Sequence, residues 1–105
     1  MTEGAPKPER APPTKSEVTK LLLEDPTNLD PYIEWLETRE NQVERSDDPH
    51  EGLRLIVDSA EILRDAQLFE GAREAYEQAA QQAVNIDLDL YTSIQEELEK
   101  LPRPS

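Results

Sequence analysis

The sequence contains no cysteine, one histidine (His50) and only three glycines. Without cysteine, the chain cannot form disulfides or bind a metal through thiolates. His50 falls at the second position of a predicted helix start, where an exposed structural role is expected. Asp47 and His50 could supply two metal ligands, which are too few for a structural site. No glycine-rich motif is present to hold a phosphate. We therefore expect no metal, no cofactor, no small-molecule substrate and no enzymatic activity.

The chain also lacks long hydrophobic runs and an excess of positive charge. No apolar stretch approaches the ~20 residues of a membrane-spanning helix, and no apolar segment typical of a signal peptide is visible. The 24 acidic residues outnumber the 11 basic ones, giving a net charge of -13. This charge repels nucleic-acid phosphates and anionic lipids, so we expect no direct nucleic-acid or membrane binding. It fits a basic protein partner, and equally a charge that only keeps a small domain in solution. From the lack of cysteine and of a visible signal peptide we expect a cytoplasmic location.

Proline marks both ends of the sequence. Residues 1–13 contain four prolines and, after Met1, no large apolar side chain, so burial cannot offset their ordering entropy. We predict a disordered tail over 1–13, a single helical domain over 14–101 and a second tail over 102–105. Only 35% of the residues are hydrophobic, which is below the globular average. Part of the chain is therefore solvated tail, or a partner covers part of its surface.

Apolar periodicity and capping residues predict an all-α fold of about five helices in antiparallel hairpins. The expected helices are 15–24, 30–45, 50–66, 68–84 and a last one that follows Asp87 or Asp89. Three starts carry capping residues: a Thr14–Glu17 capping box, Asp30 as an N-cap, and Asp48 as an N-cap with Glu51 completing a box. The alternating stretch 84–90 has no strand to pair with and is predicted to be a connection.

The apolar stripes indicate which helix faces are buried. The third helix has two apolar lines, which predicts that it lies between neighbouring helices. The stripes are Val18, Leu21 and Leu22 in the first helix, and Leu29, Ile33, Leu36 and Val43 in the second. Trp35 lies beside the second stripe and has two interpretations: a core side chain, which we favour because a small domain needs its large side chains inside, or an exposed anchor for a partner.

The third and fourth helices carry residues spaced as in a known repeat. Ala72, Tyr76 and Ala79 give a small residue, an aromatic four later and a small residue three after that, and Ala60 and Leu63 occupy matching positions in the preceding helix. Over residues 53–86 the sequence thus resembles one degenerate tetratricopeptide repeat, a motif that pairs two antiparallel helices within 34 residues. The resemblance implies a TPR-like helical bundle or short solenoid.

The resemblance also implies a ligand-facing side on the third helix. That side would carry Arg54, Val57, Glu61 and Arg64, whose basic members could hold an acidic or C-terminal carboxylate ligand. Alternatively, each of these charges only pairs with a neighbouring side chain of opposite sign. Together with Trp35 they are the predicted protein-binding residues.

These observations lead to a hypothesis of a non-catalytic protein–protein interaction module, an adaptor or small subunit of a larger assembly. The alternative is an acidic inhibitor that mimics nucleic acid and occupies a basic groove of its partner. Such a mimic needs an uninterrupted row of carboxylates, whereas arginines interrupt the acidic runs of this sequence. The partner itself is not identified by any motif.

Overall fold

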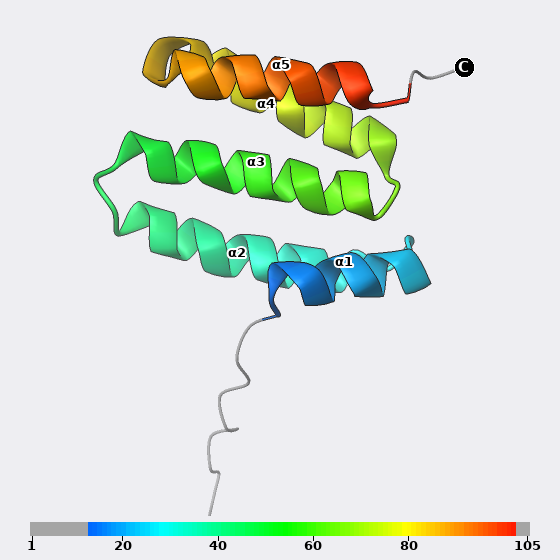
Figure 1. Cartoon of the computed structure of the whole chain (residues 1–105). Helices are drawn as coiled ribbons and strands as arrows, with labels where there is room; N and C mark the ends of the chain where they lie inside the picture. Colours follow the sequence, from blue (N-terminus) through cyan, green and yellow to red (C-terminus); the bar gives the residue numbers. More distant parts are fainter. Residues whose placement is uncertain (1–12, 103–105) are drawn as a thin grey trace, which may run out of the picture.

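The computed structural model describes residues 13–102, which form five α-helices and no β-strand (Figure 1). The helices are α1 (Lys15–Glu24), α2 (Asp30–Glu44), α3 (Pro49–Asp65), α4 (Phe69–Ile86) and α5 (Leu88–Lys100). The predicted all-α class and the number of helices are confirmed. The predicted tails, 1–13 and 102–105, lie outside the described residues except for Pro13 and Pro102. None of the helices described here has the length and apolar character needed to cross a bilayer.

The start of α1 has a side-chain cap, whereas the N-cap residue of α2 makes no such bond. Thr14 Oγ1 accepts from the Glu17 backbone N–H (3.2 Å), and the Glu17 carboxylate accepts from the Thr14 N–H (2.8 Å). This reciprocal pair is the predicted capping box. The prediction of Asp30 as the N-cap of α2 is wrong. Leu29 occupies the N-cap position, so Asp30 is the first residue of the helix, and the Asp30 N–H donates to the Asn28 side chain (3.2 Å). An earlier side chain thus provides the acceptor.

The start of α3 is only partly as predicted. Asp48 is the N-cap and its carboxylate accepts from the His50 N–H (2.9 Å). The prediction that Glu51 completes a capping box is wrong. The Asp48 N–H donates to Ser46 Oγ (3.2 Å). The Ser46 hydroxyl thus takes the place that the Glu51 carboxylate has in a capping box.

The turn between α3 and α4 reverses the chain through a left-handed residue. Gln67 has a φ of 67°, its N–H donates to the Arg64 carbonyl (2.9 Å), and the Leu68 N–H donates to the Leu63 carbonyl (2.8 Å). This pair of bonds is the Schellman motif, in which glycine is the usual left-handed residue. Here glutamine adopts the conformation that brings α4 back along α3.

A single residue separates α4 from α5. Asp87 is both the C-cap of α4 and the N-cap of α5, and its carboxylate accepts from the Leu90 N–H (3.1 Å). The prediction that residues 84–90 form a connection is therefore wrong. The apolar and polar alternation of this stretch arises because the end of one helix and the start of the next meet at Asp87.

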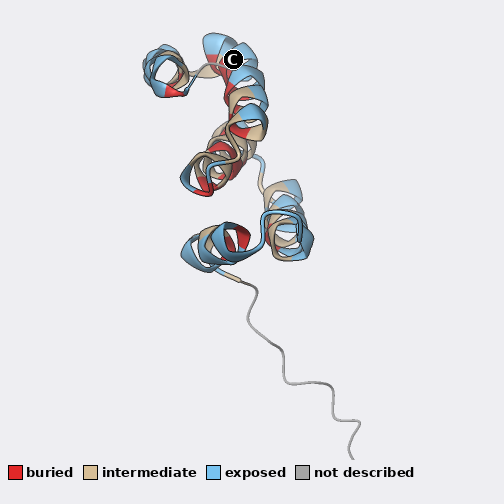
Figure 2. Ribbon diagram, turned by 90° about the vertical axis from the view of Figure 1, so that its right-hand side faces the viewer, coloured by how far each residue is buried: buried red, intermediate tan, exposed pale blue. Residues whose placement is uncertain are grey.

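Buried side chains form two clusters, and both include residues of α3. Figure 2 marks the buried residues along the ribbon. The cluster between α3, α4 and α5 contains Leu53, Ala60, Ala72, Tyr76, Ala79, Ala80, Ala83, Ile94 and Leu101. The cluster between α1, α2 and α3 contains Val18, Leu22, Trp35, Leu55, Ile62 and Ala66. The predicted two-sided burial of α3 is confirmed. The four alanines of α4 in the first cluster allow its backbone to approach α3 and α5 closely.

The helices stack in order, so the two ends of the stack differ. The α1–α2 hairpin contacts α3, α3 contacts α4, and α4 contacts α5 (Figures 1 and 2). At one end, α5 covers α4 and buries Ile94 and Leu101. At the other end, the α1–α2 hairpin has α3 on its inner side only. Three side chains that were predicted in its apolar stripes, Leu21, Leu29 and Ile33, are 41–44% exposed.

Candidate functional site

The structure places most of the predicted ligand-facing residues of α3 in contacts within the chain. One guanidinium nitrogen of Arg64 donates to the Tyr76 hydroxyl (3.0 Å) and to the Glu97 carboxylate (2.7 Å), and Arg64 Nε donates to Asp65 (3.0 Å). The bond to Asp65 raises the pKa of Arg64 more than desolvation lowers it. Burial raises the pKa of Tyr76 to about 12. Arg64 thus holds α3 to α4 and α5, with Nε and one of its two Nη atoms engaged inside the chain.

Two carboxylates of α3, Glu61 and Asp58, hold α1 against this helix. The Lys15 ammonium hydrogen-bonds to the Glu61 carboxylate and lies 3.4 Å from Asp58. Arg39 of α2 lies 3.6 Å from the other oxygen of Asp58. Burial lowers the pKa of Lys15, but the hydrogen bond and charge of Glu61 and the charge of Asp58 outweigh it and raise the pKa overall. These side chains tie the first three helices together.

The remaining predicted residues differ in exposure. Arg54 is the most open, with 68% of its side chain exposed and only Glu51 nearby at 4.0 Å. Val57 is half-buried against the α3–α4–α5 cluster. Trp35 is 5% exposed and belongs to the α1–α2–α3 cluster, stacking on Tyr32 at a ring-centroid distance of 6.3 Å. Of its two predicted roles, the core role is the one that fits this position.

Arg54 and Val57 lie beside a hollow of about 430 Å³ with mixed charge. His50 lies at its edge, with its ring nitrogens 3.3 Å from Asp48 and 3.8 Å from Asp87. The hollow is lined by Arg39, His50, Glu51, Arg54, Val57, Asp58, Asp87 and Leu90. Because carboxylates alternate with the basic groups here, the hollow has no excess of positive charge for an acidic ligand.

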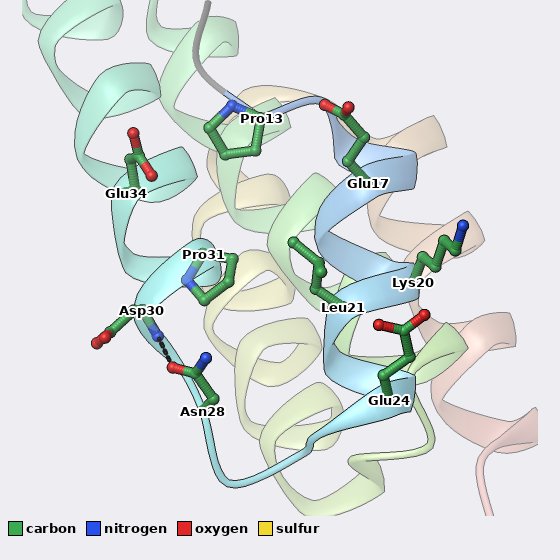
Figure 3. A pocket seen from close by; sticks show the side chains of 9 residues that line it. All are labelled: Pro13, Glu17, Lys20, Leu21, Glu24, Asn28, Asp30, Pro31 and Glu34. Atoms are coloured by element: carbon green, nitrogen blue, oxygen red, sulfur yellow. Dashed lines mark hydrogen bonds between the residues drawn. The ribbon is translucent and has the colours of Figure 1, made fainter. Parts of the chain in front are cut away.

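A larger hollow of about 620 Å³ lies between α1 and α2, at the end of the stack that α3 does not cover. We call it the outer groove. It is lined by Pro13, Glu17, Lys20, Leu21, Glu24, Asn28, Asp30, Pro31 and Glu34. Figure 3 shows α1 and α2 in front of the other helices, with Leu21 and Pro31 between them and charged side chains along both helices. The outer groove therefore has an apolar floor and an acidic rim.

Comparison of the chain with models of known protein families, with curated proteins and with solved structures found no match. The likeness to a tetratricopeptide repeat therefore rests on the spacing of residues in α3 and α4 and stays a prediction.

The outer groove was not predicted from the sequence, although the sequence carries a trace of it. Glu17, Leu21 and Glu24 recur at four and three residues, which places an apolar side chain between two carboxylates on one face of α1. The predicted apolar stripe of α1 includes Leu21, which follows Val18 by three residues. The structure instead turns Leu22 inward with Val18, and Leu21 faces the outer groove.

The described residues contain no group of three or more His, Asp or Glu side chains arranged to hold a metal ion. In the part of the chain that the structure covers, no third ligand accompanies the pair of Asp47 and His50 that the sequence offers. His50 instead lies next to the N-cap carboxylates of α3 and α5.

Proposed function

We propose that this chain is a non-catalytic protein-binding module, an adaptor or small subunit of a larger assembly, and that it binds through the outer end of the α1–α2 hairpin. The observation that carries the proposal is the unequal covering of the two ends of the helix stack. In stacked helical repeats, a terminal unit with an apolar outer face needs a cap or a partner. At the α5 end the last helix provides such a cap.

The α1–α2 end has the properties expected of a surface that a partner covers. Three large apolar side chains at this end are exposed: Leu21 (41%), which lines the outer groove, and Leu29 (43%) and Ile33 (44%), which adjoin lining residues in the sequence. Leu23 (50% exposed) does not line the groove. Single exposed apolar residues are common, but three within thirteen consecutive positions, one of them lining a groove, favour an interaction surface. Two more, Val84 and Leu88, flank the α4–α5 junction.

The alternative function, mimicry of nucleic acid, has less support from the charges. A mimic presents carboxylates to a basic groove without cations among them. On α3 the carboxylates Asp58 and Glu61 are neutralised by Lys15 and Arg39, and Glu97 of α5 is neutralised by Arg64. Four carboxylates line the outer groove together with apolar side chains, an arrangement that suits a protein partner better than a basic groove shaped for phosphates.

Site-specific photo-crosslinking in a nuclease-treated native extract tests the proposed function. A photoreactive phenylalanine analogue at position 21 is compared with the same analogue at position 77, an exposed glutamate on α4. We expect a discrete protein adduct from position 21 that excess unlabelled protein competes away, and no adduct from position 77. The absence of an adduct at position 21, or equal adducts at both positions, would refute a binding surface at this end.

A further inference from the structure

We propose that the occupant of the outer groove is an amphipathic helix of a partner, with a short apolar stripe flanked on both sides by lysine or arginine. This inference rests on the proposed function and specifies the chemistry of the partner. It follows from three properties of the outer groove: the shape of its walls, the sign of its charges and its length.

The walls of the outer groove determine the secondary structure of the occupant. They are two helices, α1 and α2, whose backbone groups are hydrogen-bonded within each helix. Such walls offer no ladder of free N–H and C=O groups to an extended peptide, and Pro13 and Pro31 in the lining have no N–H at all. Because buried backbone groups must be paired, the occupant must satisfy its own. A helix does this and presents an apolar stripe to the groove between two helices.

The charges of the outer groove determine the flanks of the occupant. Glu17 and Glu24 lie on the α1 side, Asp30 and Glu34 lie on the α2 side, and Lys20 is the one basic residue in the lining. Between residues 13 and 102, no ion pair joins any of these four carboxylates to a basic side chain. Carboxylates on both rims therefore attract cations on both flanks of the helix that lies between them.

The same charges exclude other occupants. A second copy of this chain would bring its own four groove carboxylates against these four, and like charges facing each other oppose association. Nucleic acids and anionic membrane surfaces are repelled for the same reason. An acidic helix could fill the groove by shape but would meet the rims with the wrong sign.

The length of the outer groove sets the size of the contact. Glu17 and Glu24 are seven positions apart on α1, which corresponds to ~10 Å along the helix axis. About two turns of the occupant are therefore in contact, with one or two apolar side chains against Leu21 and Pro31. A contact of this size is small compared with a standard interface, so we expect a Kd in the micromolar range, dependent on salt because of the charges.

Two synthetic peptides of identical composition test the inference. Both contain only leucine and lysine over ~18 residues, or about five helical turns. In one, the leucines recur with the helical period, and in the other they alternate with lysine. Binding of the labelled peptides to the full chain is measured by fluorescence anisotropy at about 0.15 M salt. We expect the helical-period peptide to bind at least about tenfold more tightly, with amide shifts in NMR spectra concentrated on α1 and α2.

Matched variants separate groove binding from general attraction to an acidic protein. Leu21→Lys and Leu23→Lys make the same change on the same helix, but only Leu21 lines the outer groove. We expect Leu21→Lys to weaken binding at least about tenfold and Leu23→Lys by about twofold, the effect of net charge alone. Glu34→Lys, in the rim, is expected to weaken binding more than Glu77→Lys on α4. All four sites are exposed, so the helical content should not change.

Three results would overturn the inference. Equal binding of both peptides would show that the groove does not select a helical peptide. Equal losses from Leu21→Lys and Leu23→Lys would show that the peptide follows overall charge and not the groove. A self-association of the chain that Leu21→Lys abolishes would identify a second copy as the occupant.

If the crosslink at position 21 forms while the helical peptide fails to bind, the proposed function stands and the basic-helix inference fails. If no crosslink forms, the proposed function fails.

Discussion

The hydrogen bond between Arg64 and Tyr76 predicts a measurable coupling between two residues on different helices. The Tyr76 side chain is fully buried, and within the described residues its hydroxyl contacts only the Arg64 guanidinium, at 3.0 Å. We consider Arg64→Met, which keeps an unbranched apolar stem but removes the guanidinium, and Tyr76→Phe, which removes only the hydroxyl. Each variant breaks the bond from one side, and the double variant removes both partners.

The expected magnitudes follow from what each variant leaves unpaired. Arg64→Met leaves a buried hydroxyl without a partner, worth about 1–3 kcal/mol, and removes a half-exposed ion pair with Glu97, worth about 0.2–1 kcal/mol. We expect a total loss of about 2 kcal/mol. Tyr76→Phe leaves a guanidinium that water and Glu97 still solvate, so we expect a loss of about 1 kcal/mol. The double variant should lose about 2 kcal/mol and not 3, a coupling of about 1 kcal/mol.

Urea denaturation at neutral pH, where Tyr76 with its pKa of about 12 is uncharged, measures these values. Helical circular dichroism follows the whole chain, and Trp35 fluorescence follows the α1–α2–α3 cluster. Arg54→Met is the matched control, because Arg54 is 68% exposed and should contribute less than about 0.5 kcal/mol. Additivity of the two single variants within about 0.3–0.5 kcal/mol, or an effect of Arg64→Met no larger than the control, would refute the structural role of Arg64.

Three further predictions concern the helix ends and the glycines. Gln67→Gly should raise the free energy of unfolding by about 1 kcal/mol, because glycine adopts the left-handed φ of 67° without the strain of a side chain; a loss in urea denaturation would contradict this. Gly52→Ala should stabilise the fold by about 0.5–1 kcal/mol through helix propensity, since a Cβ there meets Val43 at an ordinary 3.7 Å. Gly71→Ala should stabilise it less, because the Cβ meets Leu63 at 3.3 Å. The midpoints of thermal unfolding of the two variants show which one is more stable. The bond from the His50 N–H lowers the pKa of Asp48. Its carboxylate therefore stabilises the fold above the ordinary Asp pKa, and this contribution is lost as pH falls through the lowered value. Asp48→Ala and wild type should thus converge in free energy of unfolding in acid, and a difference between them that does not change with pH would argue against the cap.

The sequence was sufficient for the local structure of the helices. Three local features were predicted correctly: the capping box at Thr14 and Glu17, the N-cap at Asp48 and the two apolar lines of α3. Each depends on residues close together in the sequence, so it can be predicted without knowledge of the fold. The errors arose where two local solutions compete. At Asp30 a neighbouring side chain, Asn28, supplies the acceptor, and at Asp48 the hydroxyl of Ser46 does so.

The candidate sites depended on contacts between residues distant in sequence, which periodicity does not reveal. Arg64 was predicted to face a ligand, but its partner Glu97 is 33 positions away and belongs to a different helix. The outer groove has the same origin. Leu21 and Pro31 lie on different helices, and their facing depends on how α1 and α2 cross. Which of two adjacent leucines, Leu21 or Leu22, is buried also depends on this crossing and not on either residue.

The position of α3 between two clusters gives the N-terminal hairpin a stability different from that of the remaining helices. The α1–α2 hairpin buries Val18, Leu22 and Trp35, and their cluster is completed by side chains of α3. The hairpin can therefore detach while α3, α4 and α5 remain packed on their own cluster. We expect such partial opening to give faster amide hydrogen exchange in α1 and α2 than in α4. A helix bound in the outer groove would hold α1 and α2 from the opposite side, so occupancy of the groove would slow exchange in the hairpin without changing it in α4.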